Sequence, residues 1–165
     1  MTPVVRAGFL VKISNFIKTV IVFVLATLIV GVFFLYSHRM IGNSTVITIG
    51  GVGVEIELAQ TPRERERGLS QREKLAENQG MLFVFDKPDL HSFWTKEMEF
   101  PIDIIWIGEN RNIVDIARNA TPESFPQTFL PKSPALYVLE VNADWTTKNN
   151  IMIGASVSFS NGLSK

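Results

Sequence analysis

Hydrophobic positions follow one another without interruption near the amino terminus and alternate with polar positions further on. Between Lys18 and His38 no residue is charged, and Val, Ile, Leu and Phe dominate. A helix of this length spans about 30 Å, the thickness of the bilayer hydrocarbon. No polar face interrupts the apolar surface, which is unlike a helix of a soluble domain. The pattern predicts four parts: an amino-terminal segment 1–18, a transmembrane anchor 19–37, a linker 38–45 and a globular domain 46–160.

Basic residues flank this apolar stretch unequally, which predicts its orientation. Arg6, Lys12 and Lys18 precede it, whereas Arg39 alone follows closely. Because positive charge stays in the cytoplasm, we expect a single-pass protein of the plasma (inner) membrane, in contact with its lipid bilayer, with the domain outside the cytoplasm. The alternative is a cleaved signal peptide and a secreted domain. The long apolar run and the poor cleavage sequence around Ser37 favour the retained anchor.

The remaining chain reads as short strands separated by turn residues. Alternating or wholly apolar runs predict strands that are bounded by Gly, Pro, Asn and Asp. Most connections are too short for helical crossovers, so the sheet should be largely antiparallel. We expect a mainly β (α+β) domain, either a sandwich or a partly closed barrel. The predicted strands are 46–49, 54–58, 81–85, 92–96, 102–107, 113–117, 135–141 and 157–159.

Two or three short helices complete this prediction. Thr61, Pro62 and Glu64 form a capping-box start, and Gly68 is suited to end that helix. Ser70 to Glu73 repeats the capping-box pattern, and Asn142 could begin a further helix. A segment with four prolines, 122–134, is long for a connection, which favours a lid, a rim or a contact surface.

Charge and composition exclude several classes of function. Beyond Arg39 there are 12 basic and 16 acidic residues, a balance of −4, which argues against a nucleic-acid partner. The absence of cysteine excludes a thiol nucleophile and a lipid-modified cysteine. No histidine pair, calcium loop or phosphate loop is present, so we expect no metal and no cofactor. His91 is the one histidine beyond the predicted anchor region and is interpreted as a surface residue.

Several charged residues in apolar surroundings are candidates for a ligand site. Asp103 and Glu140 interrupt strongly apolar strands, where an unpaired charge is costly. One interpretation is a pair of structural salt bridges. The other is a polar cleft lined by Lys96, Asp103 and Glu140 and walled by Trp94, Trp106 and Tyr137. Arg67 and Arg72 either form a solvated helix face or reach an anionic ligand.

An ordered series of motifs resembles one known family. The motifs run from Val46 to Phe159 and include Val54-Glu55-Ile56-Glu57-Leu58, Arg67-Gly68-Leu69, Gly80-Met81-Leu82-Phe83-Val84-Phe85, Phe93-Trp94-Thr95-Lys96, Pro101-Ile102-Asp103-Ile104 and Tyr137-Val138-Leu139-Glu140. Together they resemble the prokaryotic "domain of unknown function 192" family. The resemblance implies a small β-rich domain, often behind a membrane anchor, and brings no established activity. The family usually has Trp-Met-Lys-Asn-Thr where this chain has Trp94-Thr95-Lys96-Glu97-Met98.

Three functions remain open from the sequence. We expect a membrane-anchored extracytoplasmic domain that binds a small ligand or a cell-envelope component near Lys96, Asp103 and Glu140. The first alternative is a protein-interaction module of an envelope complex, with an exposed apolar patch on 122–134. The second is a hydrolase that uses carboxylates and Lys96, although no catalytic residue stands out and an enzyme is the less favoured interpretation.

Overall fold

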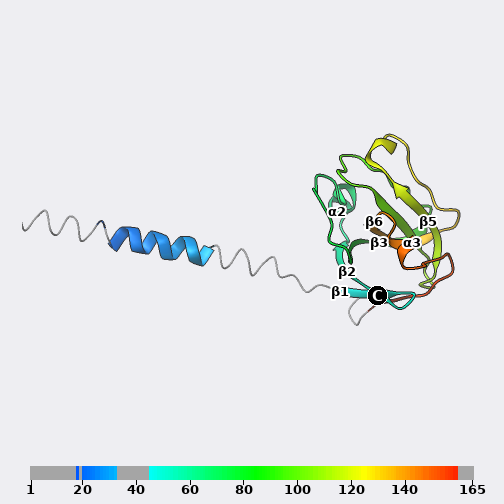
Figure 1. Ribbon diagram of the computed structural model, residues 1–165, viewed down its shortest axis with the longest axis horizontal. Coiled ribbons are helices and arrows are strands. Elements are labelled where there is room, and N and C mark those ends of the chain that lie inside the picture. Colours follow the sequence, from blue (N-terminus) through cyan, green and yellow to red (C-terminus); the bar gives the residue numbers. More distant parts are fainter. Residues whose placement is uncertain (1–17, 19, 33–44, 160–165) are drawn as a thin grey trace, which may run out of the picture. The chain divides into compact units, whose positions relative to one another are not determined.

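The structure, a computed structural model, describes residue 18 and the segments 20–32 and 45–159 (Figure 1). Contacts divide the chain into a unit before Ser44 and a unit from Ser44 onward, each considered by itself. In the first unit, residues 20–32 form an α-helix. No described helix combines the length and the apolar character that crossing a membrane requires. Much of the predicted anchor and linker, residues 19 and 33–44, lies outside the described residues, as does residue 160.

The second unit is mainly β, as predicted, with three short helices among residues 45–159. The strands and the short helices follow one another along this part of the chain (Figure 1). The elements in chain order are β1 (Thr45–Ile49), β2 (Val52–Ala59), α2 (Pro62–Arg67), β3 (Gln79–Asp89), β4 (Ile102–Ile107), β5 (Ile113–Ala120), the 3-10 helix η1 (Pro122–Ser124), β6 (Ala135–Asn142), α3 (Trp145–Lys148) and β7 (Val157–Phe159).

All seven of these strands belong to one sheet, in the order β5-β4-β6-β3-β2-β1-β7. The two edges of the sheet meet at one end, where Asn112 and Ser156 form an antiparallel bridge. The Val157 amide donates to the Arg111 carbonyl oxygen at 2.8 Å beside this bridge. The sheet therefore curls into a half-barrel, which fits the predicted partly closed barrel, and the described strands do not form the two sheets of a sandwich.

Strands β2 and β3 run parallel, unlike the other neighbouring strands of this sheet. Residues 60–78 connect them and include α2, which gives the chain the length that a parallel return requires. Thr61 caps α2 by the predicted capping box: the Glu64 amide donates to Thr61 Oγ1, and Glu64 Oε2 accepts from the Thr61 amide. The capping motif was predicted from sequence, whereas the parallel crossover was not.

Two predicted elements do not form. The second capping-box pattern, at Ser70, does not start a helix, because Gln71 adopts a left-handed backbone with φ 61°. Its amide instead donates to the Glu97 carbonyl oxygen at 2.8 Å. The expected strand 92–96 is reduced to one bridge between Phe93 and Phe129. Its in–out alternation is nevertheless present, since Phe93 and Thr95 are buried while Trp94 and Lys96 are exposed.

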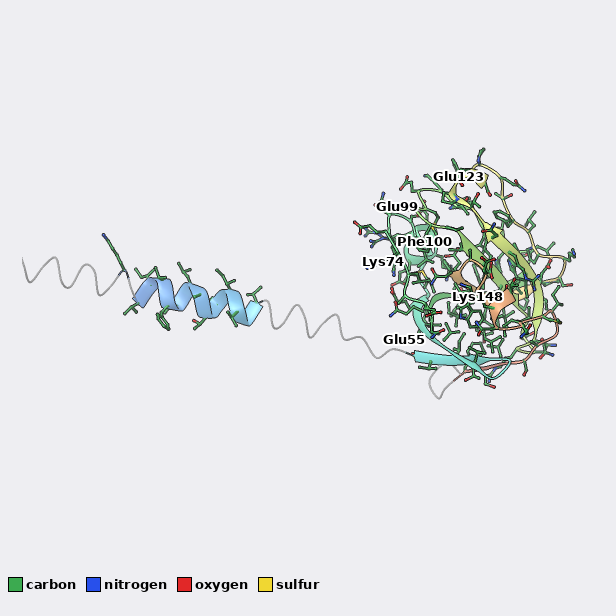
Figure 2. The ribbon with its side chains drawn as sticks, in the orientation of Figure 1. Glu55, Lys74, Glu99, Phe100, Glu123 and Lys148 are labelled. Carbon is green, nitrogen blue, oxygen red and sulfur yellow. The ribbon has the colours of Figure 1, made fainter. Side chains whose placement is uncertain are left out.

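The central strands β3, β6 and β4 are covered on both faces. One face forms the barrel interior, where Leu82, Ile105 and Leu139 pack with Trp145 of α3. The other face forms an outer layer, where Phe83, Ile104 and Val138 pack against Leu69 and the segment around Phe93. Exposed charges such as Glu55, Glu99 and Glu123 lie at the periphery of the domain (Figure 2). The outer layer positions the candidate site.

Close packing around Gly80 leaves no room for a side chain at this position of the sheet. A Cβ at this position would lie 2.8 Å from the Glu140 carbonyl oxygen and 3.0 Å from Leu139 Cδ1. We expect Gly80→Ala to lower the free energy of unfolding by about 2–3 kcal/mol in urea denaturation. Gly53→Ala is the control, because its Cβ would meet Val46 at an ordinary 3.7 Å. Equal stability of the two variants would contradict this packing.

Candidate functional site

A cavity of about 490 Å³ opens on the outer layer, between the end of α2, strand β3 and the segment 90–98. Its volume is within the usual range of small-molecule sites. Apolar and polar side chains both line it. The apolar lining residues include Leu69, Phe83, Phe85, Phe93 and Met98, and those with polar side chains are Arg65, Glu66, Arg67, Ser70, His91, Ser92 and Glu140.

Glu140 is the deepest charged group of this cavity. It lies on β6 opposite Met81 and Ile104, and therefore points into the outer layer. The residue is only 4% exposed, and its Oε2 atom has no hydrogen-bond partner. Burial raises the pKa of the Glu140 carboxyl to about 8, although the positive charge of Arg72 acts in the opposite direction. The carboxyl is therefore mostly protonated at neutral pH.

The turn after α2 leaves room above this carboxyl. Gly68 ends α2 with φ 50°, a conformation that glycine adopts readily. A Cβ at Gly68 would lie 3.7 Å from Glu140 Oε2 and 3.3 Å from the Phe83 ring. The glycine thus serves two purposes, because it allows the turn and keeps the space beside the carboxyl open.

Aromatic rings form the wall around the carboxyl. Phe83 and Phe93 meet edge to face with centroids 4.8 Å apart, and Phe85 meets Phe93 at 6.4 Å in the same geometry. The His91 ring stacks on Phe85 at 3.5 Å, and the Arg65 guanidinium lies 5.1 Å from the Phe85 centroid. Burial lowers the pKa of His91, so the imidazole is neutral at neutral pH.

Backbone hydrogen bonds hold the two walls of the cavity together. Ser70 Oγ donates to the Lys96 carbonyl oxygen at 2.9 Å, next to the bond between the Gln71 amide and Glu97. Glu97 has φ 55°, a left-handed conformation that asparagine tolerates better than most residues. The Glu97 side chain also accepts a hydrogen bond from Gln71 Nε2 at 2.7 Å.

A second, more open cavity of about 500 Å³ adjoins the first. The two share Glu66, Arg67, Ser70 and Trp94. Lys96 lines only the second cavity, where it faces the exposed Phe125 of the proline-containing segment. Trp94 is 44% exposed and stands between the two cavities.

Asp103 does not join Glu140 in a shared cleft. It lies opposite Val141 on the barrel-interior side, so the two carboxylates occupy opposite faces of the sheet. The Asp103 carboxylate accepts hydrogen bonds from the amides of Asn119, Asp144 and Thr146 and from Thr146 Oγ1, the last at 2.6 Å. The predicted convergence of Lys96, Asp103 and Glu140 is wrong, because the register of β4 and β6 separates the two carboxylates. Asp103 instead connects β4 to the ends of β5 and β6.

Of the other residues predicted for a ligand site, some line the cavity and the rest stabilise the fold elsewhere. Arg67 and Trp94 line the main cavity, as predicted for ligand contacts. Arg72 lies outside it and forms a bidentate pair with Glu57, with both hydrogen bonds at 2.7 Å. Tyr137 packs in the barrel interior against Phe159, and the buried Trp106 donates its indole N–H to the His91 carbonyl oxygen. Neither of these two rings walls the cavity, contrary to the prediction.

Sequence reasoning missed most of the cavity wall. Phe83, Phe85 and Phe93 were interpreted only as strand residues, and His91 as a surface residue. The in–out alternation of Met81, Phe83 and Phe85 was a usable signal, but only the register of β3 with β6 shows that they share a face with Glu140. Among residues 18, 20–32 and 45–159, no group of three acidic or histidine side chains is arranged to hold a metal ion.

The burial of Glu140 predicts a distinctive pH dependence of stability. Its folded pKa of about 8 exceeds the ordinary 4.5, so the folded state retains a proton that the unfolded state loses. Its contribution to stability is therefore full below pH 4.5 and is lost as pH rises towards 8, at up to about 1.4 kcal/mol per pH unit. We expect urea denaturation at pH 5 to 8 to show this loss in the parent protein relative to Glu140→Gln.

Asp103→Asn provides the contrast for this experiment. Its amide group would face N–H donors that now bond to the carboxylate, so we expect about 2–3 kcal/mol lower stability at pH 7.

Parallel pH profiles for the parent and Glu140→Gln would contradict the protonated, buried state of Glu140.

Comparison with known proteins identifies the family but no activity. A crystal structure of a protein of unknown function from Novosphingobium aromaticivorans DSM 12444 is similar with a TM-score of 0.65 and 32% identity, covering 68% of this chain and 83% of that one. A Sinorhizobium meliloti 1021 protein named a "putative transcription regulator" is similar with a TM-score of 0.65 and 29% identity, covering 70% and 91%. A search of curated proteins gives no significant match. The family model of DUF192, described as "Uncharacterized ACR, COG1430", matches residues 45–159, and the chain belongs to this uncharacterised family.

Proposed function

We propose that the domain binds a small ligand in the Glu140 cavity. The observation that carries this proposal is the buried Glu140 Oε2, which has no hydrogen-bond partner beside an open cavity. Leaving such a group unsatisfied costs about 1–3 kcal/mol, and a ligand that pairs with it recovers this cost. Core carboxyls without that role are normally satisfied internally, as Asp103 is.

The shape and lining of the cavity support a small ligand more than a protein partner. A concave site that combines apolar walls with a few polar groups is typical of small-molecule binding. The alternative, a protein-interaction module, draws on the exposed Phe125 and Leu130 of the segment 122–134, which are 45% and 59% exposed. These two side chains alone are ordinary for a protein surface. The name of the Sinorhizobium meliloti relative does not change this preference, because the acidic balance of this chain disfavours nucleic acid.

A ligand screen with matched variants tests the proposal. Thermal unfolding of the full chain is measured against a library of polar and amphipathic small molecules. At a concentration of about 100 times Kd, a specific ligand adds about 2.7 kcal/mol of stability, which is a clear rise in Tm. We expect at least one compound to raise the Tm of the parent but not of Glu140→Gln.

Glu55→Gln is the matched control, since Glu55 is an exposed glutamate of β2 that does not line the cavity (Figure 2). It should respond to that compound as the parent does. Compounds that raise the Tm of all three proteins equally bind elsewhere, and a screen that yields only such compounds rejects the proposal.

We further propose that residues 19–37 anchor the domain to the plasma (inner) membrane, with the domain outside the cytoplasm. The support is the uncharged apolar run and the basic residues Arg6, Lys12 and Lys18 before it. Within the described part of this run, apolar side chains are exposed all round the helix, for example Phe23 at 71% and Ile29 at 69%. Lipid is a favourable surrounding for such a surface.

Fractionation of cells that express the full chain tests the anchor. We expect the protein to stay in the membrane pellet after alkaline carbonate washing, and external protease to digest the domain in spheroplasts. Two charges introduced into the run, as Val24→Lys and Ile29→Lys, should release it from the pellet. A soluble parent protein, or an amino terminus that begins beyond Ser37, would reject retention.

A further inference from the structure

We propose that the ligand of the Glu140 cavity carries a primary alkylammonium group at one end and an anionic group at the other, as an ω-amino acid does. This inference rests on the proposed function and specifies the ligand class. It follows from three observations: the depth at which the Glu140 carboxyl lies, the apolar side chains of the wall, and an arginine at the mouth of the cavity.

The wall selects a ligand with an apolar stem. Leu69, Phe83, Phe93 and Met98 are at most 8% exposed and offer no hydrogen-bonding side-chain group beyond a thioether. A sugar or nucleoside needs partners along its whole length, and these side chains provide almost none. An alkyl chain needs none, and it gains stability from apolar burial.

The floor selects a cationic head group. Glu140 lines the cavity and its buried Oε2 atom has no hydrogen-bond partner, and an ammonium group offers three N–H donors together with a charge opposite to that of the ionised carboxylate. A carboxylate or phosphate head would instead place a second negative charge beside Glu140 once this carboxyl, with its pKa of about 8, is ionised.

The mouth selects an anionic tail. Arg65 already donates to the Val84 carbonyl oxygen at 2.9 Å and lies over Phe85, so its guanidinium is engaged. Arg67 is exposed and lines both cavities, and none of the described residues forms a hydrogen bond or a close ion pair with its guanidinium, although its charge acts on Glu57. It can therefore bind a ligand carboxylate, while Glu66 beside it limits the positive charge at the mouth.

Isothermal titration calorimetry of the full chain with ω-amino acids tests this proposal. The probes are 4-aminobutanoate, 6-aminohexanoate and 8-aminooctanoate, which vary the stem length. Hexanoate and 6-hydroxyhexanoate are the controls without an ammonium group. We expect at least one probe to bind about tenfold more tightly than either control at pH 8, and Glu140→Gln to weaken that binding at least about tenfold.

The pH dependence gives an independent readout. An ammonium ion pairs with an ionised Glu140, so binding at pH 6 to 7 must release the Glu140 proton. Affinity should rise up to about tenfold per unit from pH 6 to 8, with proton release detectable in buffers of different ionisation enthalpy. The other charged or titratable groups around the carboxyl are Arg72, Arg65, Glu66, Arg67 and His91, and the neutral state of His91 keeps it from contributing above pH 7.

Further titrations test which residue binds the anionic end of the ligand and whether the ammonium group belongs to a free small molecule or to a lysine side chain. Arg67→Gln should weaken the best ω-amino acid and leave hexylamine unchanged, whereas Arg63→Gln, a neighbouring arginine outside the main cavity, should change neither. Nα-acetyl-lysine methylamide presents the alkylammonium group of a polypeptide lysine without a carboxylate. Binding about tenfold weaker than the best ω-amino acid supports a free small molecule, and equal binding overturns the anionic end.

The failures of this inference and of the proposed function are distinguishable. A neutral compound that depends on Glu140, and binds less tightly as pH rises above 8, would overturn the alkylammonium assignment and leave the cavity a binding site. Equal binding of 6-hydroxyhexanoate and 6-aminohexanoate would do the same. If no compound of any charge depends on Glu140, both proposals fall.

Discussion

Burial of the three central strands on both faces is the constraint on which the domain depends. Side chains of β3, β6 and β4 point either into the barrel interior or into the outer layer, and both are apolar. A polar group in β4, in β6 or in the buried first half of β3 cannot reach bulk water by turning to the other side, so it must find partners inside the protein. Asp103 and Glu140 meet this constraint in opposite ways. Asp103 binds four donors and fastens the ends of β5 and β6, whereas Glu140 stays protonated beside a cavity.

That difference separates a structural carboxylate from a functional candidate. The two residues look alike in the sequence, since each is an acid in an apolar strand. Their environments differ in the number of available N–H and O–H donors, which burial alone does not reveal. Asp103 lies where β5 and the turn before α3 present backbone amides. Glu140 faces aromatic rings and a glycine turn, which present no donor to Oε2.

Sequence patterns predicted the elements whose formation depends on residues close together in the chain. The alternation of β2, the apolar run of β4 and the capping box at Thr61 all gave the correct element, because each depends on neighbouring residues. The parallel return from β2 to β3 and the pairing of β4 with β6 depend on residues far apart in sequence. Trp94 and Arg67 line the cavity, and their contact with a ligand stays a prediction, whereas Asp103 and Tyr137 lie on the barrel-interior face, away from Glu140.

The two walls of the cavity are joined by one main-chain hydrogen bond and two bonds from side chains. The Gln71 amide donates to the Glu97 carbonyl oxygen, Ser70 Oγ donates to the Lys96 carbonyl oxygen, and Gln71 Nε2 donates to the Glu97 carboxylate. The rim residues Arg67, Leu90 and Trp94 take no part in these three bonds. Replacing a rim residue would therefore change the entrance of the cavity while the frame around Glu140 keeps its form.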